Sequence, residues 1–262
     1  MDQAAPSAAP RRPSMPDLMA EIWHVVQDLP VFLTAPLYRQ WHLRWGATVA
    51  EATAELPGDT LVPAAQYRST RAITIDAPAS KIWPWLVQVG CLRGGFYSDD
   101  LLDNLAYPSA TTIIPEFQHL EVGQLVPMSP PARTSERTAF SVHSFRVNEW
   151  LLWSKPDSTW AWSLTPNGTG GTRLVARIRA WYDWRHPLAG TAAVLLMEFG
   201  DFAMLRRMLR GIKARAELPP QVFRMLDHGR CHRTEVSDGC DDRPSMLSRD
   251  QGLRAASRKP IT

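Results

Sequence analysis

The chain has 262 residues, of which 45% are hydrophobic and 21% charged, and its formal net charge is +3. This length supports one domain with a full core and appended segments, or two small domains. The nearly balanced charge argues against nucleic acid as a partner, because domains that bind nucleic acid carry a basic excess. The longest apolar run, residues 191–205, contains Glu198 and Asp201, so we expect no membrane-spanning segment.

Composition also bears on the compartment and on the interior of the fold. Cys91, Cys231 and Cys240 are an odd set, and residues 1–14 lack the apolar run of a secretory signal, so we expect a reduced, cytoplasmic setting. Residues 1–14 are rich in Ala, Pro and Arg and are predicted to be disordered. Eleven tryptophans fit a fold around a sizeable apolar interior, although tryptophan is also simply a large core residue.

Residues 15–66 are predicted to form a helical arm and a linker. Apolar residues recur there at helical spacing, and Pro30 and Pro36 are expected to break the helix into pieces. The periodic residues are Leu18, Ile22, Val25, Val26 and Leu29. Aromatic and basic side chains of the arm fit a membrane interface, although packing on the domain is the commoner fate. These side chains are Trp23, Phe32, Trp41, Trp45, Arg39 and Arg44.

The main body is expected to span residues 67–218 and to begin with a strand and a helix. Residues 70–78 alternate as a strand, after which Asp76 and Pro78 signal the start of a helix. That helix covers residues 79–88, and Pro84 is expected to kink it or to mark a join between two short helices.

A Gly-Gly pair follows this helix. Such a pair before a helix can cradle a phosphate, but this segment lacks the Lys and Ser/Thr spacing of a phosphate-binding loop. We interpret Gly94 and Gly95 as a sharp turn that places Phe96 and Tyr97 beside the sheet, either at a cavity mouth or as ordinary core residues. Ser98, followed by two aspartates, is typical of a helix N-cap.

Five strands are expected after residue 120. They cover residues 120–128, 138–150, 151–156, 158–166 and 171–184. Turn signals rich in Pro, Asn and Gly separate them at the short spacing of an antiparallel meander. The apolar set of the second of these strands changes phase near His143, which indicates a β-bulge.

The last strand alternates sharply between apolar and basic residues. Its apolar face consists of Leu174, Ala176, Ile178, Ala180 and Tyr182. Its basic face consists of Arg173, Arg177 and Arg179. The basic face is expected to be solvated, with an anionic partner as the minority interpretation.

Residues 191–217 predict one long helix, which Pro219 and Pro220 end. Its expected buried stripe is Leu195, Phe199, Phe202, Leu205, Leu209, Ile212 and Ala216. Gly200 and Gly211 lie inside this helix and are expected to permit close packing or a bend. Residues 219–262 are polar and aperiodic, so a mobile tail is predicted there, whose deletion should leave folding and ligand binding intact.

In this order the elements resemble the SRPBCC superfamily, the START, polyketide-cyclase and birch-pollen-allergen group. The resemblance covers about residues 70–217 and rests on residues 73–90, 94–105 and 171–181 with the terminal helix. It implies an α+β helix-grip fold, in which a curved antiparallel sheet wraps around a long C-terminal helix and encloses a hydrophobic cavity. Members bind lipids, sterols, polyketides or other apolar molecules, and some catalyse cyclisation or dehydration. The family has no universal catalytic motif, so the resemblance implies no mechanism.

The predicted site is this cavity, with an apolar small molecule as the partner and with no cofactor or metal. Its candidate lining residues are Trp85, Phe96, Tyr97, Leu101, Phe140, Trp162, Ile178, Phe199 and Phe202. Metal-capable side chains also gather in the tail, but their spacing matches no zinc site. They are His228, Cys231, His232 and Cys240.

Two classes of function stay open. A non-catalytic carrier or sensor is favoured, because the body contains no recognisable pair of nucleophile and base. The alternative is a cyclase or dehydratase type of enzyme, which a cavity carboxylate or histidine with a shifted pKa would favour. The acid–base candidates are Glu116, His119, His143 and Glu198. Helix periodicity places Glu198 at solvent or beside an arginine rather than in the cavity. Peripheral membrane association through the arm is a second alternative.

Overall fold

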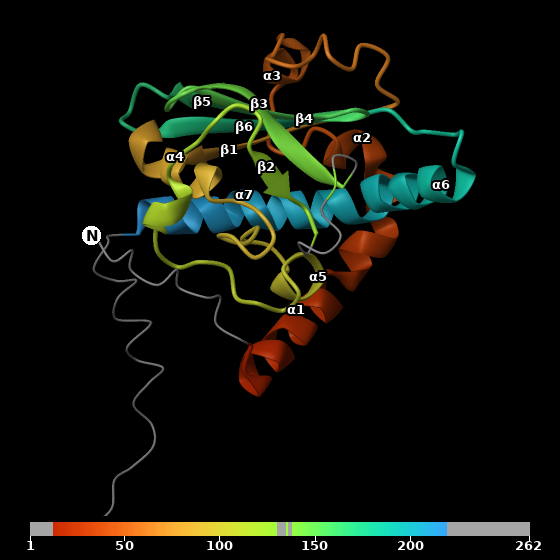
Figure 1. Ribbon diagram of the computed structural model, residues 1–262, viewed down its shortest axis with the longest axis horizontal. Coiled ribbons are helices and arrows are strands. Elements are labelled where there is room, and N and C mark those ends of the chain that lie inside the picture. Colours follow the sequence, from red (N-terminus) through yellow and green to blue (C-terminus); the bar gives the residue numbers. More distant parts are fainter. Residues whose placement is uncertain (1–12, 130–134, 136–137, 219–262) are drawn as a thin grey trace, which may run out of the picture.

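A computed structural model describes residues 13–129, 135 and 138–218 of the chain. Within this part, six strands form one antiparallel sheet in the order β1-β6-β5-β4-β3-β2 (Figure 1). The strands are β1 (Tyr67–Ile75), β2 (Leu125–Pro127), β3 (Ala139–Arg146), β4 (Trp150–Lys155), β5 (Ser158–Pro166) and β6 (Thr172–Ala180). The pairing of β3 with β4 shifts between Val142 and Ser144, which confirms the predicted bulge near His143.

A long C-terminal helix packs against one face of this sheet. It begins with α6 (Pro187–Leu195), widens into a single π-helical turn, η4 (Leu196–Gly200), and continues as α7 (Asp201–Glu217). In Figure 1 this helix runs beneath the sheet along its whole width. A curved antiparallel sheet gripping one long helix is the helix-grip α+β fold, as the resemblance implied.

Short helices join β1 to the rest of the sheet. They are α4 (Ala79–Val87), α5 (Asp100–Asp103) and the 3-10 turn η2 (Pro115–Phe117). α4 is a single helix with Pro84 inside it, so of the two expected outcomes, a kink or a join between two short helices, the join is wrong. The N-cap of α5 is Asp99 rather than Ser98, and the hydroxyl of Ser98 instead donates to the Asp103 carboxylate.

The core lies between the sheet and α7 and is dominated by aromatic rings. Trp153, Trp160 and Trp162 pack together with ring-centroid separations of 5.0 to 5.7 Å. Trp153 and Trp162 are almost fully buried, and β4 and β5 place all three side chains on the face that meets α7. Trp83 and Trp85 are buried as well, so five of the eleven tryptophans are core residues, whereas Trp23, Trp41, Trp181 and Trp184 are at least 42% exposed.

The predicted buried stripe of the C-terminal helix is right in α7 and wrong before it. Phe202, Leu205, Leu209, Ile212 and Ala216 are buried. Leu195 is 53% exposed and Phe199 is only half-buried. The cause is the π-helical turn, which adds a residue to one turn and rotates everything before it relative to α7. A regular period of 3.6 residues cannot anticipate that rotation.

The arm begins with one uninterrupted helix, α1 (Met15–Thr34), so the expectation that Pro30 would break it is wrong. Proline removes one N–H donor, and at an exposed position water can satisfy the freed carbonyl. The 3-10 turn η1 (Ala35–Tyr38) and the short helix α2 (Arg39–His42) follow. α1 packs on α5, η4 and α7 and runs diagonally away from the body (Figure 1). No helix in the described residues is both long and apolar enough to cross a membrane.

Residues 46–63, here called the outer segment, cover the face of the sheet that points away from α7. The segment contains the helix α3 (Val49–Thr53), whose N-cap Thr48 forms a capping box with Glu51. The prediction of a solvated basic face is therefore wrong for Arg177 and Arg179, which are 1% and 8% exposed. Arg173 stays partly exposed and forms a two-pronged ion pair with Glu51 at 2.7 and 2.9 Å.

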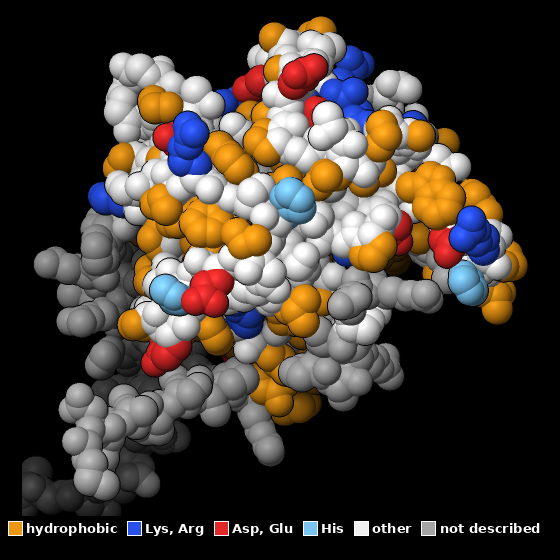
Figure 2. Space-filling view, turned by 45° about the horizontal axis from the view of Figure 1, so that its top comes forward, with side chains coloured by type: hydrophobic (Ala, Val, Ile, Leu, Met, Phe, Trp, Pro, Cys, Tyr) orange, Lys and Arg blue, Asp and Glu red, His pale blue; other side chains and the backbone are white. Residues whose placement is uncertain are grey.

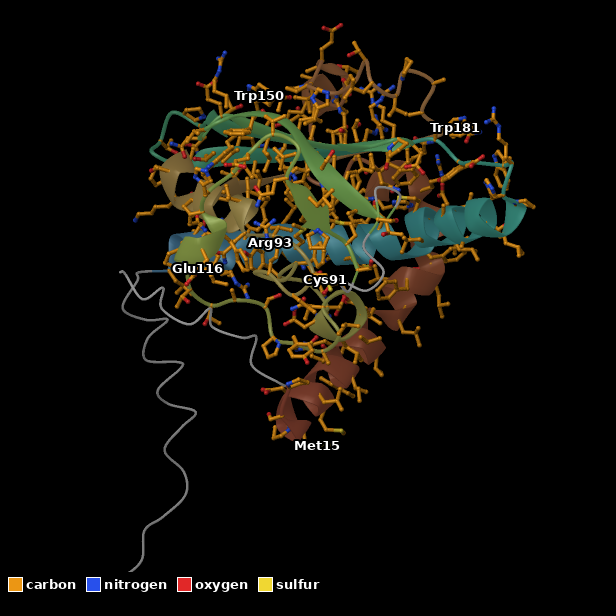
Figure 3. The ribbon with its side chains drawn as sticks, viewed as in Figure 1. Met15, Cys91, Arg93, Glu116, Trp150 and Trp181 are labelled. Atoms are coloured by element: carbon orange, nitrogen blue, oxygen red, sulfur yellow. The ribbon has the colours of Figure 1, made fainter. Side chains whose placement is uncertain are left out.

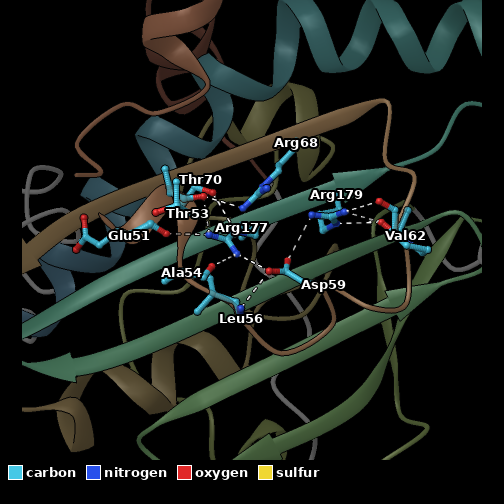
Figure 4. A network of polar contacts seen from close by, with 12 residues as sticks. Glu51, Thr53, Ala54, Leu56, Asp59, Val62, Arg68, Thr70, Arg177 and Arg179 are labelled. Carbon is cyan, nitrogen blue, oxygen red and sulfur yellow. Dashed lines mark hydrogen bonds and ion pairs between the residues drawn. The ribbon is translucent and has the colours of Figure 1, made fainter. Parts of the chain in front are cut away.

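The two buried arginines hold the outer segment through its carbonyl oxygens (Figure 4). Arg177 donates to Ala54 O at 2.7 Å and to Glu51 O at 2.8 Å, both of which the end of α3 leaves without helical partners. It also pairs with Asp59 at 2.6 Å. Arg179 donates to Val62 O at 2.8 Å. The planar guanidinium, with five N–H groups, suits this multiple contact.

Candidate functional site

A cavity of about 310 Å³ lies between the C-terminal helix and the inner face of the sheet. Its apolar walls come from β3, β5 and β6 on one side and from α6, η4 and α7 on the other. Trp181 and Leu196 line it and are 42% and 53% exposed, so they mark the end at which it opens. This volume lies at the lower end of the range of small-molecule pockets.

Three of the nine predicted lining residues border this cavity. They are Phe96, Phe140 and Ile178. The other six do not line it. Trp85, Tyr97, Trp162 and Phe202 are buried in the core, and Leu101 and Phe199 are half-buried elsewhere.

The Gly-Gly corner accounts for the separation of Phe96 from Tyr97. A Cβ at Gly95, where φ is +76°, would lie 2.2 Å from the Ser109 hydroxyl, so the chain can turn here only with glycine. Phe96 then points to the cavity. Tyr97 points the other way, packs edge-on against Trp85 and donates its hydroxyl to Trp85 O at 3.0 Å.

Methionines form much of the lining that sequence reasoning missed. They are Met128, Met197, Met204 and Met208. Met204 and Met208 are four residues apart, which places them on one face of α7, so this part of the signal was present in the sequence. Methionine is unbranched and polarisable, and it adapts readily to ligands of different shape.

Asp201 at the start of α7 is the first of three acidic groups in the wall; the others are Asp103 and Asp157, and Asp157 pairs with Lys155 at 2.9 Å. Arg71 contacts it at 2.5 Å, and the Tyr67 hydroxyl donates to it at 2.7 Å. Burial raises the pKa of Tyr67, which therefore stays a donor. Arg71 is fully buried and also donates to His42 O at 2.8 Å. Asp201 is thus held as a structural carboxylate that ties β1 and α2 to α7.

Asp103 on α5 is the second acidic group in the wall. Burial raises its pKa to about 8, and the neighbouring Asp100 and Asp99 act in the same direction. The Ser98 hydroxyl donates to one carboxylate oxygen, and Oδ1 is buried with no hydrogen-bond partner among the described residues. At neutral pH Asp103 therefore carries a proton.

The other two aspartates of this segment have structural partners. Asp100 accepts from the backbone and the hydroxyl of Ser109 at 2.7 and 2.5 Å, and Asp99 lies 3.2 Å from Arg207 Nη1. They hold the corner and α5 in place, whereas Asp103 is left to face the cavity.

None of the acid–base candidates from the sequence lines the cavity. Glu198 forms a bidentate ion pair with Arg39 at 2.8 and 2.9 Å. This is one of the two positions expected from the sequence, beside an arginine rather than in the cavity. Glu116, His119 and His143 are exposed, and Figure 3 shows Glu116 at the opposite end of the molecule from Trp181. The tail histidines and cysteines lie outside the described residues, as does the predicted mobile tail.

Comparison with known proteins adds little beyond the fold. No protein-family model and no curated protein matches the chain. A polyketide-cyclase-like protein from Corynebacterium glutamicum is 16% identical, with 63% of this chain and 97% of that one aligned at a TM-score of 0.36. CalU16 from Micromonospora echinospora is 15% identical over 62% and 88% of the two chains, with a TM-score of 0.27. A protein from Mesorhizobium loti is 15% identical over 57% and 96%, with a TM-score of 0.32.

Because these identities and TM-scores are low, the matches support no conclusion about the activity of this chain. The strand order, the long helix and the cavity between them define the chain as a helix-grip protein, and the resemblance to the SRPBCC superfamily holds at the level of the fold.

On the face shown in Figure 2, charged side chains of both signs are scattered among apolar ones.

Proposed function

We propose that the protein binds an apolar small molecule in the cavity between the sheet and the C-terminal helix and acts as its carrier or sensor. The observation that carries this proposal is the cavity of about 310 Å³ itself, walled by Phe, Trp, Ile, Leu and four Met side chains and open at one end. Apolar walls gain free energy from a ligand that displaces water from them. The cytoplasmic location stays a prediction.

Titration with Nile red, a neutral apolar fluorophore, tests this proposal. We expect saturable binding with a blue-shifted emission. Ala193→Trp fills the cavity from its helical wall and should weaken binding at least about tenfold, because overpacked apolar sites exclude a ligand. Ala192→Trp is the matched control, since Ala192 is exposed, adjacent and does not line the cavity. Absence of saturable binding to the unmodified protein would contradict the proposal.

An enzyme of the cyclase or dehydratase type is the second candidate, and Asp103 favours it. A protonated carboxyl in an apolar wall is a competent general acid near neutral pH. Catalysis needs a base as well, but Asp201 is bound by Arg71 and Tyr67, and Asp157 pairs with Lys155. The carrier is therefore placed first.

Mass spectrometry of the small molecule retained by the native protein separates the two candidates. A carrier should release the same molecule before and after prolonged incubation. An enzyme should convert it, and Asp103→Asn should stop that conversion while leaving binding intact.

A further inference from the structure

A second hollow of about 200 Å³ lies outside the cavity, where α1 packs on α7. The described residues that line it, here called the arginine groove, are Asp28 and Val31 of α1 and Ala203, Arg206, Arg207 and Arg210 of α7. One acidic and three basic side chains leave this lining with a formal charge of +2. The groove is therefore basic, although the charge of the whole chain is nearly balanced.

The acidic side chain of the groove is already engaged. Asp28 forms an ion pair with Arg207. Arg207 also donates to His24 O at 3.1 Å and lies 3.2 Å from the carboxylate of Asp99, which is fully buried and does not line the groove. Arg207 thus ties α1 and the start of α5 to α7, and its role is structural.

Arg206 and Arg210 supply the charge that remains. Neither has an ion-pair partner within the described part of the chain. They are four residues apart on α7, so they lie on one face of the helix, where two like charges destabilise it. Burial lowers the pKa of Arg206, and repulsion by Arg210 acts in the same direction. An anion placed between them would relieve this repulsion.

The indole ring of Trp45 positions both guanidinium groups. Its centroid lies 5.7 Å from Arg206 Cζ and 5.5 Å from Arg210 Cζ. Such cation–π contacts orient an arginine but do not neutralise its charge. Arg206 Nε is buried, whereas the two Nη groups of Arg206 reach solvent, and Arg210 is exposed. Donors that can meet a ligand are therefore held in place before it binds, which reduces the entropy lost on binding.

We propose that the arginine groove binds the phosphate group of a soluble phosphate monoester, as a second site that is separate from the apolar cavity. A phosphate dianion matches the charge of +2 on the lining. Its oxygens can accept hydrogen bonds from two planar guanidinium groups at once, and such charge-assisted bonds are the strong ones.

The orientation of α1 favours a soluble ligand over a lipid headgroup. Val26 and Leu29 of this helix are about half exposed. Asp28 and Val31 each follow one of them by two positions, and residues two apart point about 200° apart around a helix. The groove therefore lies on the far side of α1 from these apolar side chains, and a lipid beneath them would not reach it.

Two ligands with one skeleton and different charge test this proposal. At about pH 8 phenyl phosphate is a dianion, because the second pKa of a phosphate monoester is about 6, whereas phenyl sulfate is a monoanion. Isothermal titration calorimetry at about 0.15 M salt, which screens non-specific surface charge, measures both affinities. We expect phenyl phosphate to bind about tenfold more tightly than phenyl sulfate, since its second charge strengthens the hydrogen bonds to both arginines.

Variants locate the effect. Arg206→Gln combined with Arg210→Gln should weaken the binding of phenyl phosphate at least about tenfold. Arg206→Lys combined with Arg210→Lys keeps the charge but loses the planar forks, so it should give an intermediate affinity. Lys81→Gln combined with Arg185→Gln is the matched control, since it removes two positive charges at exposed positions outside the groove. Far-UV circular dichroism should be the same for all these proteins, which shows that the variants fold.

Each outcome decides the proposal. Binding of phenyl phosphate that only the changes at Arg206 and Arg210 weaken supports it. An equal loss in the Lys81 and Arg185 control, or no binding to the unmodified protein, overturns it. Co-sedimentation with phosphatidic-acid vesicles that depends on Arg206 and Arg210, without binding of phenyl phosphate, would overturn the assignment to a soluble ligand. The proposed apolar site stands or falls separately, through its own titration with Nile red.

Discussion

Asp103 differs from a surface carboxylate in the direction of its effect on stability. Its pKa in the folded protein is raised from 3.8 to about 8, chiefly by burial. The unfolded chain therefore releases this proton at lower pH than the folded protein does. The resulting destabilisation is absent below pH 3.8, grows as the pH rises and is complete above about pH 8.

The Asp103→Asn variant should remove this pH dependence. Asparagine keeps the shape and still accepts a hydrogen bond from Ser98, but it cannot ionise. We expect the variant to melt at a higher temperature than the unmodified protein at about pH 8 and at nearly the same temperature at about pH 4.

Differential scanning fluorimetry over this pH range measures the effect. Asp100, whose pKa burial raises to about 6, should leave a smaller residual slope in the variant. Asp76→Asn, at a side chain that is 81% exposed, is the control and should follow the unmodified protein. An unchanged pH profile in Asp103→Asn would show that the Asp103 carboxyl is solvated.

The sequence correctly predicted the structural role of individual residues where a single local rule was sufficient. The bulge near His143 follows from a change of phase, and the glycine corner follows from backbone freedom. Asp103 and Tyr182 could not be assigned to the site, because their surroundings come from β5, α5 and η4 together. Glu198 and Arg39 are 159 positions apart in the sequence. The sequence could therefore suggest that Glu198 pairs with an arginine, but it could not identify Arg39 as the partner.

At the scale of elements, the outer segment shows how a basic strand face can be buried. The pattern of β6 correctly separates an apolar face from a basic one, but it does not reveal that another segment supplies acceptors for the arginines. The carbonyls that receive Arg177 are free because α3 ends after five residues. The outer segment, which precedes the first strand, therefore covers the second face of the sheet.

Replacement of Arg177 should therefore unfold the protein readily. Arg177→Leu leaves Asp59 and several carbonyl oxygens without their donor, and loss of one partner of a buried pair costs about 3 to 5 kcal/mol. Urea unfolding measures the change in free energy. Arg146→Leu, which breaks an ion pair with side chains 68% and 56% exposed, should cost less than about 1 kcal/mol. Equal effects of the two changes would contradict the structural role of Arg177.

The contact of α7 with the glycine corner gives a second prediction at this scale. A Cβ at Gly211 would lie 2.3 Å from Tyr97 O, so Gly211→Ala must push the helix away from the corner. We expect a loss of about 1 to 3 kcal/mol in unfolding free energy, although alanine is the better helix former by about 1 kcal/mol. At Gly200 the added Cβ would come no closer than 3.3 Å, to a flexible Leu196 side chain. Gly200→Ala should accordingly be neutral or stabilising.

At the scale of the whole molecule, α1 differs from an ordinary surface helix, because it presents a row of apolar side chains to solvent. Two of its acidic residues are turned toward the body, since Asp28 pairs with Arg207 of α7 and the Glu21 side chain is only 19% exposed. Seven of its apolar residues are between 40% and 69% exposed, whereas Leu18, Val25, Val31 and Phe32 are half-buried. The seven are Met15, Met19, Ile22, Trp23, Val26, Leu29 and Leu33. Their spacing by threes and fours forms one apolar stripe along the helix.

We propose that this stripe docks on a lipid bilayer surface and brings the cavity mouth to it. α1 packs on η4, and Leu196 of η4 and Trp181 line the cavity where it opens. An apolar ligand could then pass between bilayer and cavity with little exposure to water. α1 contains no Lys or Arg, so attachment should depend on apolar insertion and only weakly on anionic lipid.

Vesicle co-sedimentation tests this proposal. The protein should bind phosphatidylcholine vesicles, and phosphatidylserine should change its affinity by less than about tenfold. Trp23→Ser combined with Leu33→Ser should weaken binding by about tenfold or more, because each exposed side chain buries apolar area in the bilayer. Val122→Ser combined with Val147→Ser is the matched control, since these residues are 68% and 55% exposed but lie outside the stripe. Vesicles that leave the protein in solution would overturn the proposal. If sedimentation equilibrium then showed a dimer that only the Trp23 and Leu33 pair of changes dissociates, a second copy of the chain would be the partner that covers α1.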